Sequence, residues 1–107
     1  MTSTLEQRKD FTFAFGTHPM EAAWAKEAIF FIDVERVTGE AALLKTKVQI
    51  SADGIHWLDE GSGFPVIKEK GHYFIRASHF GGWLRLWGDI EGQNSCFNLT
   101  IHLVLKE

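Results

Sequence analysis

Hydrophobic and polar residues alternate along much of the chain, with the period of two that is typical of half-buried β-strands. The clearest example is the segment 97–105, where one face carries Phe97, Leu99, Ile101, Leu103 and Leu105. Segments 11–15, 28–37 and 44–51 alternate in the same way. We therefore expect an all-β protein.

Turn-forming residues separate these segments. Asp53-Gly54 lies between the 44–51 strand and a short strand expected at 55–59. Asp-Gly is a strong hairpin signal because glycine adopts a positive φ without a steric cost. The predicted structural hairpin comprises Ser51, Asp53, Gly54 and Trp57, and we expect its indole to pack in the core.

Glycine-containing turns predict further reversals of the chain. They are expected at residues 38–40, 61–63, 70–71, 81–82 and 92–94. The strands between them would cover 64–68, 72–78 and 83–90. About eight short strands with regular turns predict a single antiparallel β-sandwich of the jelly-roll type.

Two N-terminal segments do not alternate clearly. The polar residues 1–10 are expected to form a flexible segment, so that the β-sandwich domain would occupy 11–107. Residues 21–28 are rich in helix formers, and Pro19 is suited to a first helical turn. A short helical turn and an irregular connection both remain open for 17–28.

Composition and charge narrow the range of partners. The chain has 107 residues, enough for one domain, and a formal net charge of −3, which offers no footprint for nucleic acid. No apolar run approaches the roughly 20 residues needed to cross a bilayer. The N-terminus lacks the apolar stretch of a signal peptide. We expect a cytoplasmic protein with neither membrane nor nucleic-acid partners.

The polar residues match no familiar catalytic or metal-binding pattern. The five histidines lack the paired spacings of zinc ligands, which favours isolated histidines over a metal site, and we expect no cofactor. The single cysteine, Cys96, has no neighbouring cation or helix start that would activate its thiol. A small hydrolase using Asp59, Glu60 and His56 is an alternative that requires these groups to converge. The expectation is a protein without enzymatic activity.

Aromatic residues give the strongest indication of function. If Leu84 and Leu86 point inward, the strand 83–90 turns two tryptophans and an arginine outward. The predicted interaction face comprises Trp83, Arg85, Trp87, Asp89 and, from another strand, Phe31. Aromatic residues and arginine are enriched in interface centres. The alternative is that these rings pack at the rim or in the core.

A carbohydrate-binding module is a second interpretation of the same face. Residues i and i+2 of a strand lie about 7 Å apart, so the two indoles could stack on successive sugar rings. Arg85 and Asp89 would then form hydrogen bonds with sugar hydroxyls.

The segment KVQISADGIHW (47–57) is similar to a hairpin of discoidin-like domains, in which the tryptophan packs in the core. Over residues 28–106 the chain resembles short β-sandwich proteins of tailed phages, prophages and their bacterial hosts. The motifs that carry this resemblance are FIDVERVTG (31–39), the S-x-D-G-x-x-W hairpin (51–57), GHYFIR (71–76), WLRL (83–86) and FNLTIHLVL (97–105). The resemblance implies a non-catalytic structural module, located in the virion if phage-derived, that forms a homo-oligomer or docks on a larger assembly.

Overall fold

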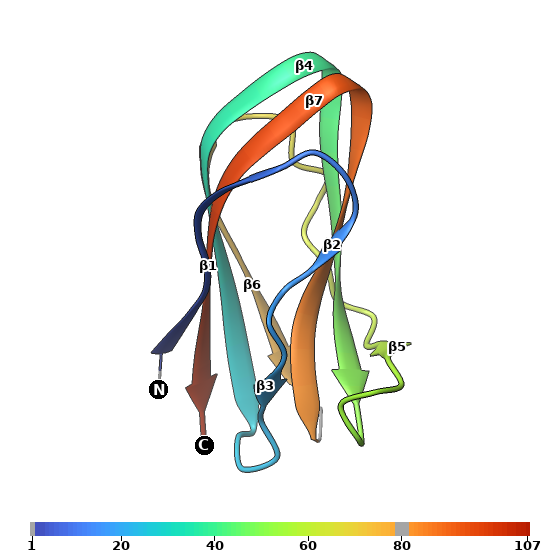
Figure 1. Cartoon of the computed structure of the whole chain (residues 1–107). Coiled ribbons are helices and arrows are strands. Elements are labelled where there is room, and N and C mark those ends of the chain that lie inside the picture. Colours follow the sequence, from blue (N-terminus) through green and yellow to red (C-terminus); the bar gives the residue numbers. More distant parts are fainter. Residues whose placement is uncertain (1, 79–81) are drawn as a thin grey trace.

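The computed structural model describes residues 2–78 and 82–107, which form seven β-strands and no helix. Two long strands dominate, β4 (Glu27–Ser51) and β7 (Trp83–Lys106). The others are β1 (Thr2–Phe11), β2 (Phe15–Gly16), β3 (Met20–Glu21), β5 (Leu58–Asp59) and β6 (Gly71–Ser78). All seven belong to one antiparallel sheet, so the all-β prediction is confirmed (Figure 1).

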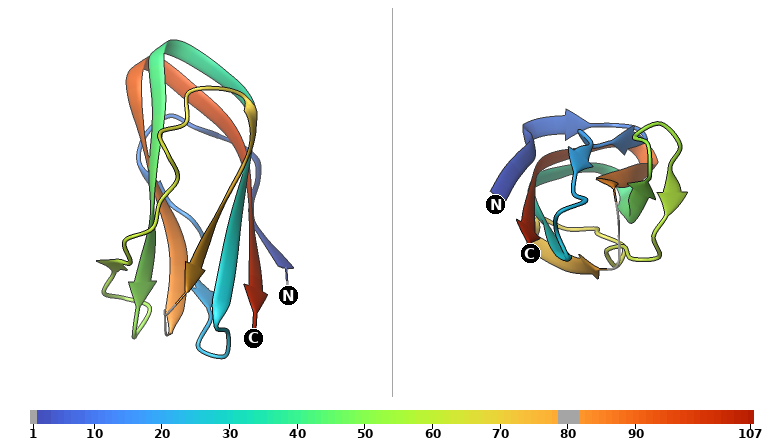
Figure 2. Two further views of the ribbon diagram at one scale, coloured as in Figure 1. Left: turned by 180° about the vertical axis from the view of Figure 1, so that it is seen from behind. Right: turned by 90° about the horizontal axis from the view of Figure 1, so that it is seen from below.

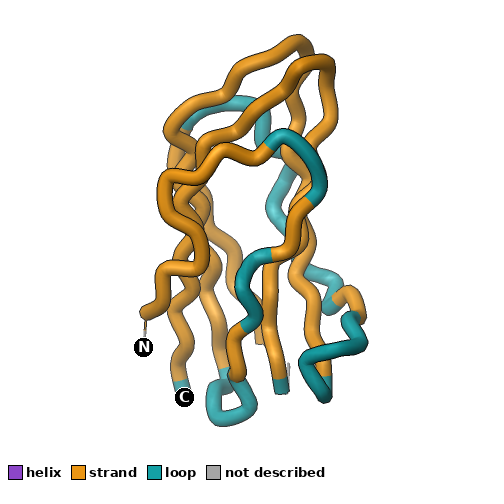
Figure 3. Tube along the Cα trace, in the orientation of Figure 1, coloured by secondary structure: helices purple, strands orange, loops and turns teal. Residues whose placement is uncertain are grey.

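Strands β4 and β7 pair along their whole length, from Glu27 opposite Lys106 to Ser51 opposite Trp83. Register shifts occur near the middle, between residues 34 and 43 of β4. Gly39 and Gly92 have φ angles of 109° and 111° there, and the two strands bend together. Figure 3 shows that strand conformation continues through the bend.

The bend divides this ribbon into two arms. The first arm pairs residues 27–38 of β4 with 96–106 of β7, and the second arm pairs 40–51 with 83–93. Strands β1 and β6 flank the first arm, where they pair with β7 and β4 respectively. Strands β2 and β3 pair with β7 in the second arm, and β5 pairs with β4. Figure 2 shows the strands from behind and from below, arranged around the core.

The prediction of chain reversals at 38–40 and 92–94 is wrong. Both segments lie inside continuous strands, β4 and β7. Each of these long strands therefore counts once among the seven. The bulges bend each strand without ending its pairing, because the partner strand bends at the same place. The expected turn at 81–82 lies partly outside the described residues.

The two arms share one hydrophobic core. A single cluster of buried residues contains side chains from both arms. The first arm contributes the fully buried Phe30, Ile32, Phe97, Leu99, Ile101 and Leu103, and the second contributes Leu44, Val48, Leu84 and Leu86. The inward faces predicted from alternation in 28–37, 83–90 and 97–105 are therefore confirmed.

The N-terminal residues expected to be flexible lie in a strand instead. Residues 2–10 belong to β1, which pairs with the edge of β7 from Thr2 opposite Val104 to Phe11 opposite Phe97. Leu5 is buried in the core cluster. Backbone pairing to an available edge strand places this polar segment in the sheet, although its composition contributes little apolar surface.

The segment 11–15 is not one strand. Phe11 and Phe15 are buried with their ring centroids 4.1 Å apart, whereas Phe13 between them is 75% exposed. The chain leaves the strand conformation between β1 and β2 and re-enters it at Phe15. Phe11 and Phe15 therefore stack on each other because the strand is interrupted over residues 12–14.

The connection over 17–26 is irregular apart from β3, residues 27–28 begin β4, and the expected helical turn is not formed. Apart from one local bond, from Ala25 N to Ala22 O at 3.1 Å, its backbone groups pair with distant residues. Ala22 N donates to Gly82 O at 2.6 Å, and Lys26 N donates to Lys106 O at 2.8 Å. Hydrogen bonds to residues at or next to the two ends of β7 therefore form in place of the helical turn that the local sequence favours.

The two short strands expected after the Asp-Gly turn are only partly formed. Instead of 55–59, β5 covers Leu58–Asp59, and within 64–68 a single bridge joins Ile67 to Leu44. Strand β6 agrees closely with the expected 72–78.

Candidate functional site

The Asp-Gly loop between β4 and β5 is held by hydrogen bonds to Ser51 and Asp53. The N–H of Gly54 donates to Ser51 Oγ at 2.8 Å, and Gly54 has a φ of 78°. Asp53 Oδ1 accepts the N–H groups of Ile55 and His56, at 2.8 and 2.9 Å. These bonds, led by the one from the His56 backbone, lower the pKa of the Asp53 carboxyl. Pairing of Ile50 with Leu58 closes a hairpin here, with a loop over 52–57 in place of the expected turn at Asp53-Gly54 alone.

Trp57 does not pack in the core, contrary to the prediction. Its indole is half-buried, and the Arg85 guanidinium carbon lies 4.3 Å from the ring centroid. Arg85 faces away from the interior, which Leu84 and Leu86 fill on the other side of the strand. The loop 52–57 therefore carries the indole over the outer side of the second arm.

The outer side of β7 in the second arm carries three of the predicted face residues. Trp83, Arg85 and Trp87 are half-buried and alternate with buried residues. Together with Trp57 they form what we call the aromatic face. Asp89 is exposed two residues further along the same strand.

Arg85 lies between two indoles of the aromatic face. Its guanidinium carbon is 5.3 Å from the Trp87 ring centroid, in addition to the 4.3 Å contact with Trp57. Arg85 Nε donates to Gln49 Oε1 at 2.8 Å. Partial burial lowers the pKa of this guanidinium, which remains charged because arginine titrates far above neutral pH. The cation is thus fixed by two rings and one amide.

The hydrogen-bond network extends from Gln49 to the edge of the sheet. Gln49 Nε2 donates to Asp59 Oδ1 at 3.1 Å, and Lys47 Nζ lies 3.3 Å from Asp59 Oδ2. The bond from Gln49, followed by the one from Lys47, lowers the pKa of the Asp59 carboxyl. A charged rim therefore borders the aromatic face on the β5 side.

Two glycines allow backbone to approach the rings closely. A Cβ added at Gly16 of β2 would lie 3.3 Å from both Arg85 Nη1 and the Trp87 ring. A Cβ added at Gly54 would lie 3.4 Å from the Trp83 ring. The aromatic face is therefore braced by its neighbours and organised before any partner binds.

A shallow cleft of about 210 Å³ adjoins Trp87. Its other lining residues are Lys45, Thr46, Lys47 and Asp89. Lys45 Nζ lies 2.7 Å from Glu91 Oε2, and this hydrogen bond raises the pKa of Lys45. The cleft thus combines one aromatic surface with ammonium and carboxylate groups.

The structure does not bring Phe31 to the aromatic face. Phe31 lies in the first arm, where it is opposite Phe74 in β6 and His102 in β7. Its ring centroid is 6.1 Å from that of Phe74. Conversely, Trp57 joins the face although the sequence assigned it to the core; an Asp-Gly turn signal does not indicate to which side of a sheet the following residue folds.

The candidate hydrolase residues do not share a site. His56 Nδ1 lies 2.8 Å from Asp53 Oδ2, whereas Asp59 is bonded to Gln49 and Lys47. Glu60 accepts a hydrogen bond from the backbone of Ser62 at 3.0 Å. Within 2–78 and 82–107, no cluster of three or more histidine, cysteine or acidic side chains could hold a metal ion.

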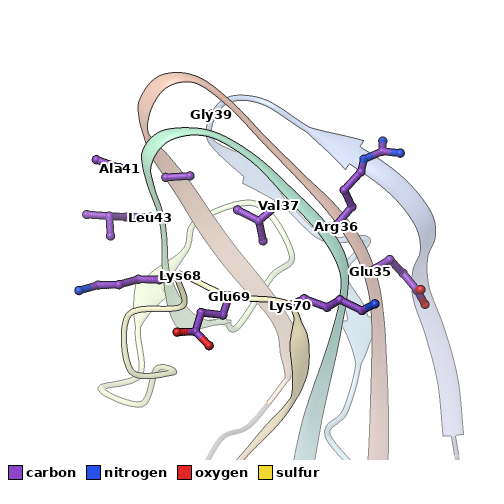
Figure 4. Close-up of a pocket in the computed structure, with 10 residues that line it drawn as sticks. Glu35, Arg36, Val37, Gly39, Ala41, Leu43, Lys68, Glu69 and Lys70 are labelled. Carbon is purple, nitrogen blue, oxygen red and sulfur yellow. The ribbon is translucent and has the colours of Figure 1, made fainter.

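A larger concavity of about 720 Å³ lies at the bend of the ribbon (Figure 4). Residues on both sides of the bend line it, along with 68–70. Figure 4 shows the ammonium group of Lys68 and the carboxylate of Glu35 pointing away from each other, on opposite sides of the opening. Its charged groups do not converge on a common point, so we place the candidate site at the aromatic face.

Comparisons with known proteins assign no family to the chain: no family model matches it, and no curated protein matches its sequence. Among the residues that the structure describes, there is no helix suited to spanning a membrane. What the protein does must therefore be inferred from its own surface.

Proposed function

We propose that this protein is a non-catalytic interaction module that self-associates, or docks on a larger assembly, through the aromatic face. The observation that carries this proposal is the Arg85 guanidinium, held between the indoles of Trp57 and Trp87 on the outer side of the sheet. Tryptophan and arginine are the residues most enriched at binding hot spots. Because these side chains are already fixed, binding would immobilise few of them, which lowers the entropic cost of association.

The surroundings of the aromatic face resemble the anatomy of an interface. Ile55 and Leu58 flank Trp57 in the sequence and are 74% and 69% exposed. Leu58 is opposite Ile50 and so lies on the other side of the sheet from Gln49 and Arg85, and the apolar centre is therefore the aromatic face itself. The ion pairs Lys47–Asp59 and Lys45–Glu91 supply a polar border. An apolar centre with a polar rim is typical of protein–protein interfaces.

We also propose that the bent sheet is a jelly-roll-like β-sandwich in which each arm forms one layer. The support for this is that β4 and β7 both pass from one arm to the other and that both arms contribute to a single core. With the resemblance to short phage and prophage proteins, this architecture favours a structural role, in the cytoplasm or in a virion.

Light scattering over a range of concentrations tests self-association. The wild-type chain should show a mass above the 12.1 kDa of one chain, rising with concentration. Trp87→Ala should weaken association about tenfold or more, as expected for a hot-spot residue. Phe13→Ala removes a more exposed ring outside the face and should behave as wild type. A chain that stays monomeric at millimolar concentration, or equal behaviour of the two variants, would contradict self-association through the aromatic face.

Carbohydrate binding is a second candidate, favoured by the cleft beside Trp87. A sugar ring stacked on this indole would find ammonium and carboxylate partners in Lys45 and Asp89. Tryptophan fluorescence during glycan titration, together with a glycan array, provides the test. Quenching that is lost in Trp87→Ala would support sugar binding; no binding to plant, bacterial or animal glycans would exclude it.

A further inference from the structure

The open edges of the sheet differ in how well they are protected against pairing with another strand. Strand β1 contains two register shifts, between Thr4 and Glu6 and between Glu6 and Lys9, and its exposed residues include Arg8 and Asp10. Strands β2, β3 and β5 are two residues long. Bulges, charges and short length are the usual means of preventing edge-to-edge association.

Strand β6 has neither a register shift nor the two-residue length of these strands, and its charged side chain, Arg76, contacts the Phe74 ring. It pairs with β4 residue by residue, from Gly71 opposite Val34 to Ser78 opposite Glu27, without a register shift. Its eight residues include no proline. In the described part of the chain, β6 pairs with no strand except β4. Its outer edge therefore offers backbone N–H and C=O groups to an incoming strand.

Both faces of β6 also carry apolar surface that is incompletely covered. On the inner face, Tyr73 and Ile75 pack on the core but are only half-buried, while Phe30, opposite Ile75 in β4, is fully buried. On the outer face, Phe74 is 54% exposed, and the guanidinium carbon of Arg76 lies 5.3 Å from its ring centroid. A strand added along β6 would cover apolar groups on both sides.

We propose that this strand is β6 of a second copy of the chain, paired antiparallel about a two-fold axis at Ile75. Residues opposite each other in a sheet share a face, so the axis must pass through a residue rather than between two. An axis at Ile75 places Phe74 of each copy opposite Arg76 of the other, which forms two cation–π contacts. An axis at Phe74 would instead place Arg76 opposite His72, where protonation brings two cations together.

This interface goes beyond the aromatic face and is separate from it. Strand β6 flanks the first arm, whereas the aromatic face lies on the second. A two-fold contact uses the same patch on both copies and closes on itself. The aromatic face of each copy would then remain available, so that the dimer is a bivalent unit for a larger assembly.

Sedimentation velocity tests the interface in the Trp87→Ala background, where association through the aromatic face is weakened. This variant should form a dimer of twice the 12.1 kDa chain mass. Adding Phe74→Lys, a charge at an exposed edge position, should raise the dimer dissociation constant at least tenfold. Adding Phe13→Lys should leave it unchanged. A monomer at millimolar concentration, or a dimer that persists with Phe74→Lys, would overturn the proposal.

Disulfide cross-linking tests the register independently. With Cys96→Ser as background, Ile75→Cys places two thiols opposite each other at a Cα separation of about 4.5–5.5 Å, which a disulfide can span. Tyr73→Cys should not cross-link, because the two thiols would lie four residues, about 13 Å, apart along the strands. Equal cross-linking of the two variants, or none with Ile75→Cys, would overturn the two-fold pairing.

Trp87→Ala and Phe74→Lys, each introduced alone into the wild-type chain, separate the two proposals. If the aromatic face does not mediate self-association, Trp87→Ala has no effect on the wild-type mass, and Phe74→Lys alone yields a monomer. If the β6 edge does not associate, Trp87→Ala alone yields the monomer.

Discussion

Arg85 and Trp57 should be energetically coupled, because the guanidinium carbon of one lies 4.3 Å from the ring centroid of the other. The perturbation is a double-mutant cycle with Arg85→Ala and Trp57→Ala. Each single variant removes the contact, and the double variant removes it only once. The two single losses of stability should therefore sum to more than the loss in the double variant.

The structure sets the expected magnitudes. A cation–π contact contributes about 0.5–1 kcal/mol at exposed sites and about 2 kcal/mol when desolvated, so the half-buried pair should couple by about 1 kcal/mol. Arg85→Ala also removes the hydrogen bond to Gln49, which adds about 1.5–3 kcal/mol for a charged donor. We expect about 3 kcal/mol for Arg85→Ala. Trp57→Ala should cost about 2 kcal/mol, near half the loss for a fully buried ring.

Urea unfolding followed by far-ultraviolet circular dichroism provides the free energies, because fluorescence would change with each tryptophan removed. A second cycle, Arg85→Ala with Trp24→Ala, is the control, and its effects should be additive. Additivity of the Arg85 and Trp57 variants within about 0.3 kcal/mol would refute the coupling.

Three further predictions concern the scaffold of the face. Leu86→Ala, in the core, should lower the free energy of unfolding by about 2–5 kcal/mol. Leu58→Ala, at an exposed position, should change it by under about 0.5 kcal/mol. Urea titrations that give equal losses for the two variants would contradict the assigned core. Gly39→Ala should lower the melting temperature more than Gly61→Ala, although both glycines have a positive φ. The new Cβ at position 39 would lie 2.5 Å from the backbone of β7, whereas a Cβ at position 61 would meet nothing within 4 Å. Asp53 has a lowered pKa in the folded protein, so its carboxylate stabilises the fold above its ordinary value of 3.8, and this contribution is lost as the pH falls from there through the native pKa. The stability difference between wild type and Asp53→Asn should accordingly shrink below about pH 4 in an unfolding series, and a constant difference would contradict the assigned hydrogen bonds.

The strand faces could be predicted from the sequence because burial imposes a period of two on the side chains. This holds for 28–37, 83–90 and 97–105, whose apolar positions form the core. The bend of the ribbon could not be predicted in the same way. Glycines near 39 and 92 fit a chain reversal and a bulged strand equally well, because both conformations use positive φ. The outcome depends on whether a distant partner strand bends at the same place.

The candidate site was predicted only in part, because its composition also depends on the bend and on contacts between distant segments. Trp83, Arg85 and Trp87 follow from the phase of one strand, and the structure places them together. Phe31 has the correct phase but lies on the other arm, so its separation from the face follows from the bend. The position of Trp57 depends on how the loop 52–57 crosses the sheet, which no local pattern specifies.

Polarity was similarly insufficient to predict the structure of residues 2–10. Their composition indicates little burial, and apart from Leu5 they contribute little to the core. Their place in β1 depends on the unpaired edge of β7, which exists only once the long ribbon has formed.

The most direct test of the aromatic face as a binding surface is an NMR dilution series that follows the indole N–H signals of the four tryptophans. From millimolar to micromolar concentration, the signals of Trp57, Trp83 and Trp87 should shift together as copies dissociate, while that of Trp24 stays constant. If all four signals are independent of concentration, or if Trp24 shifts as much as the others, the aromatic face is not the surface through which the protein associates.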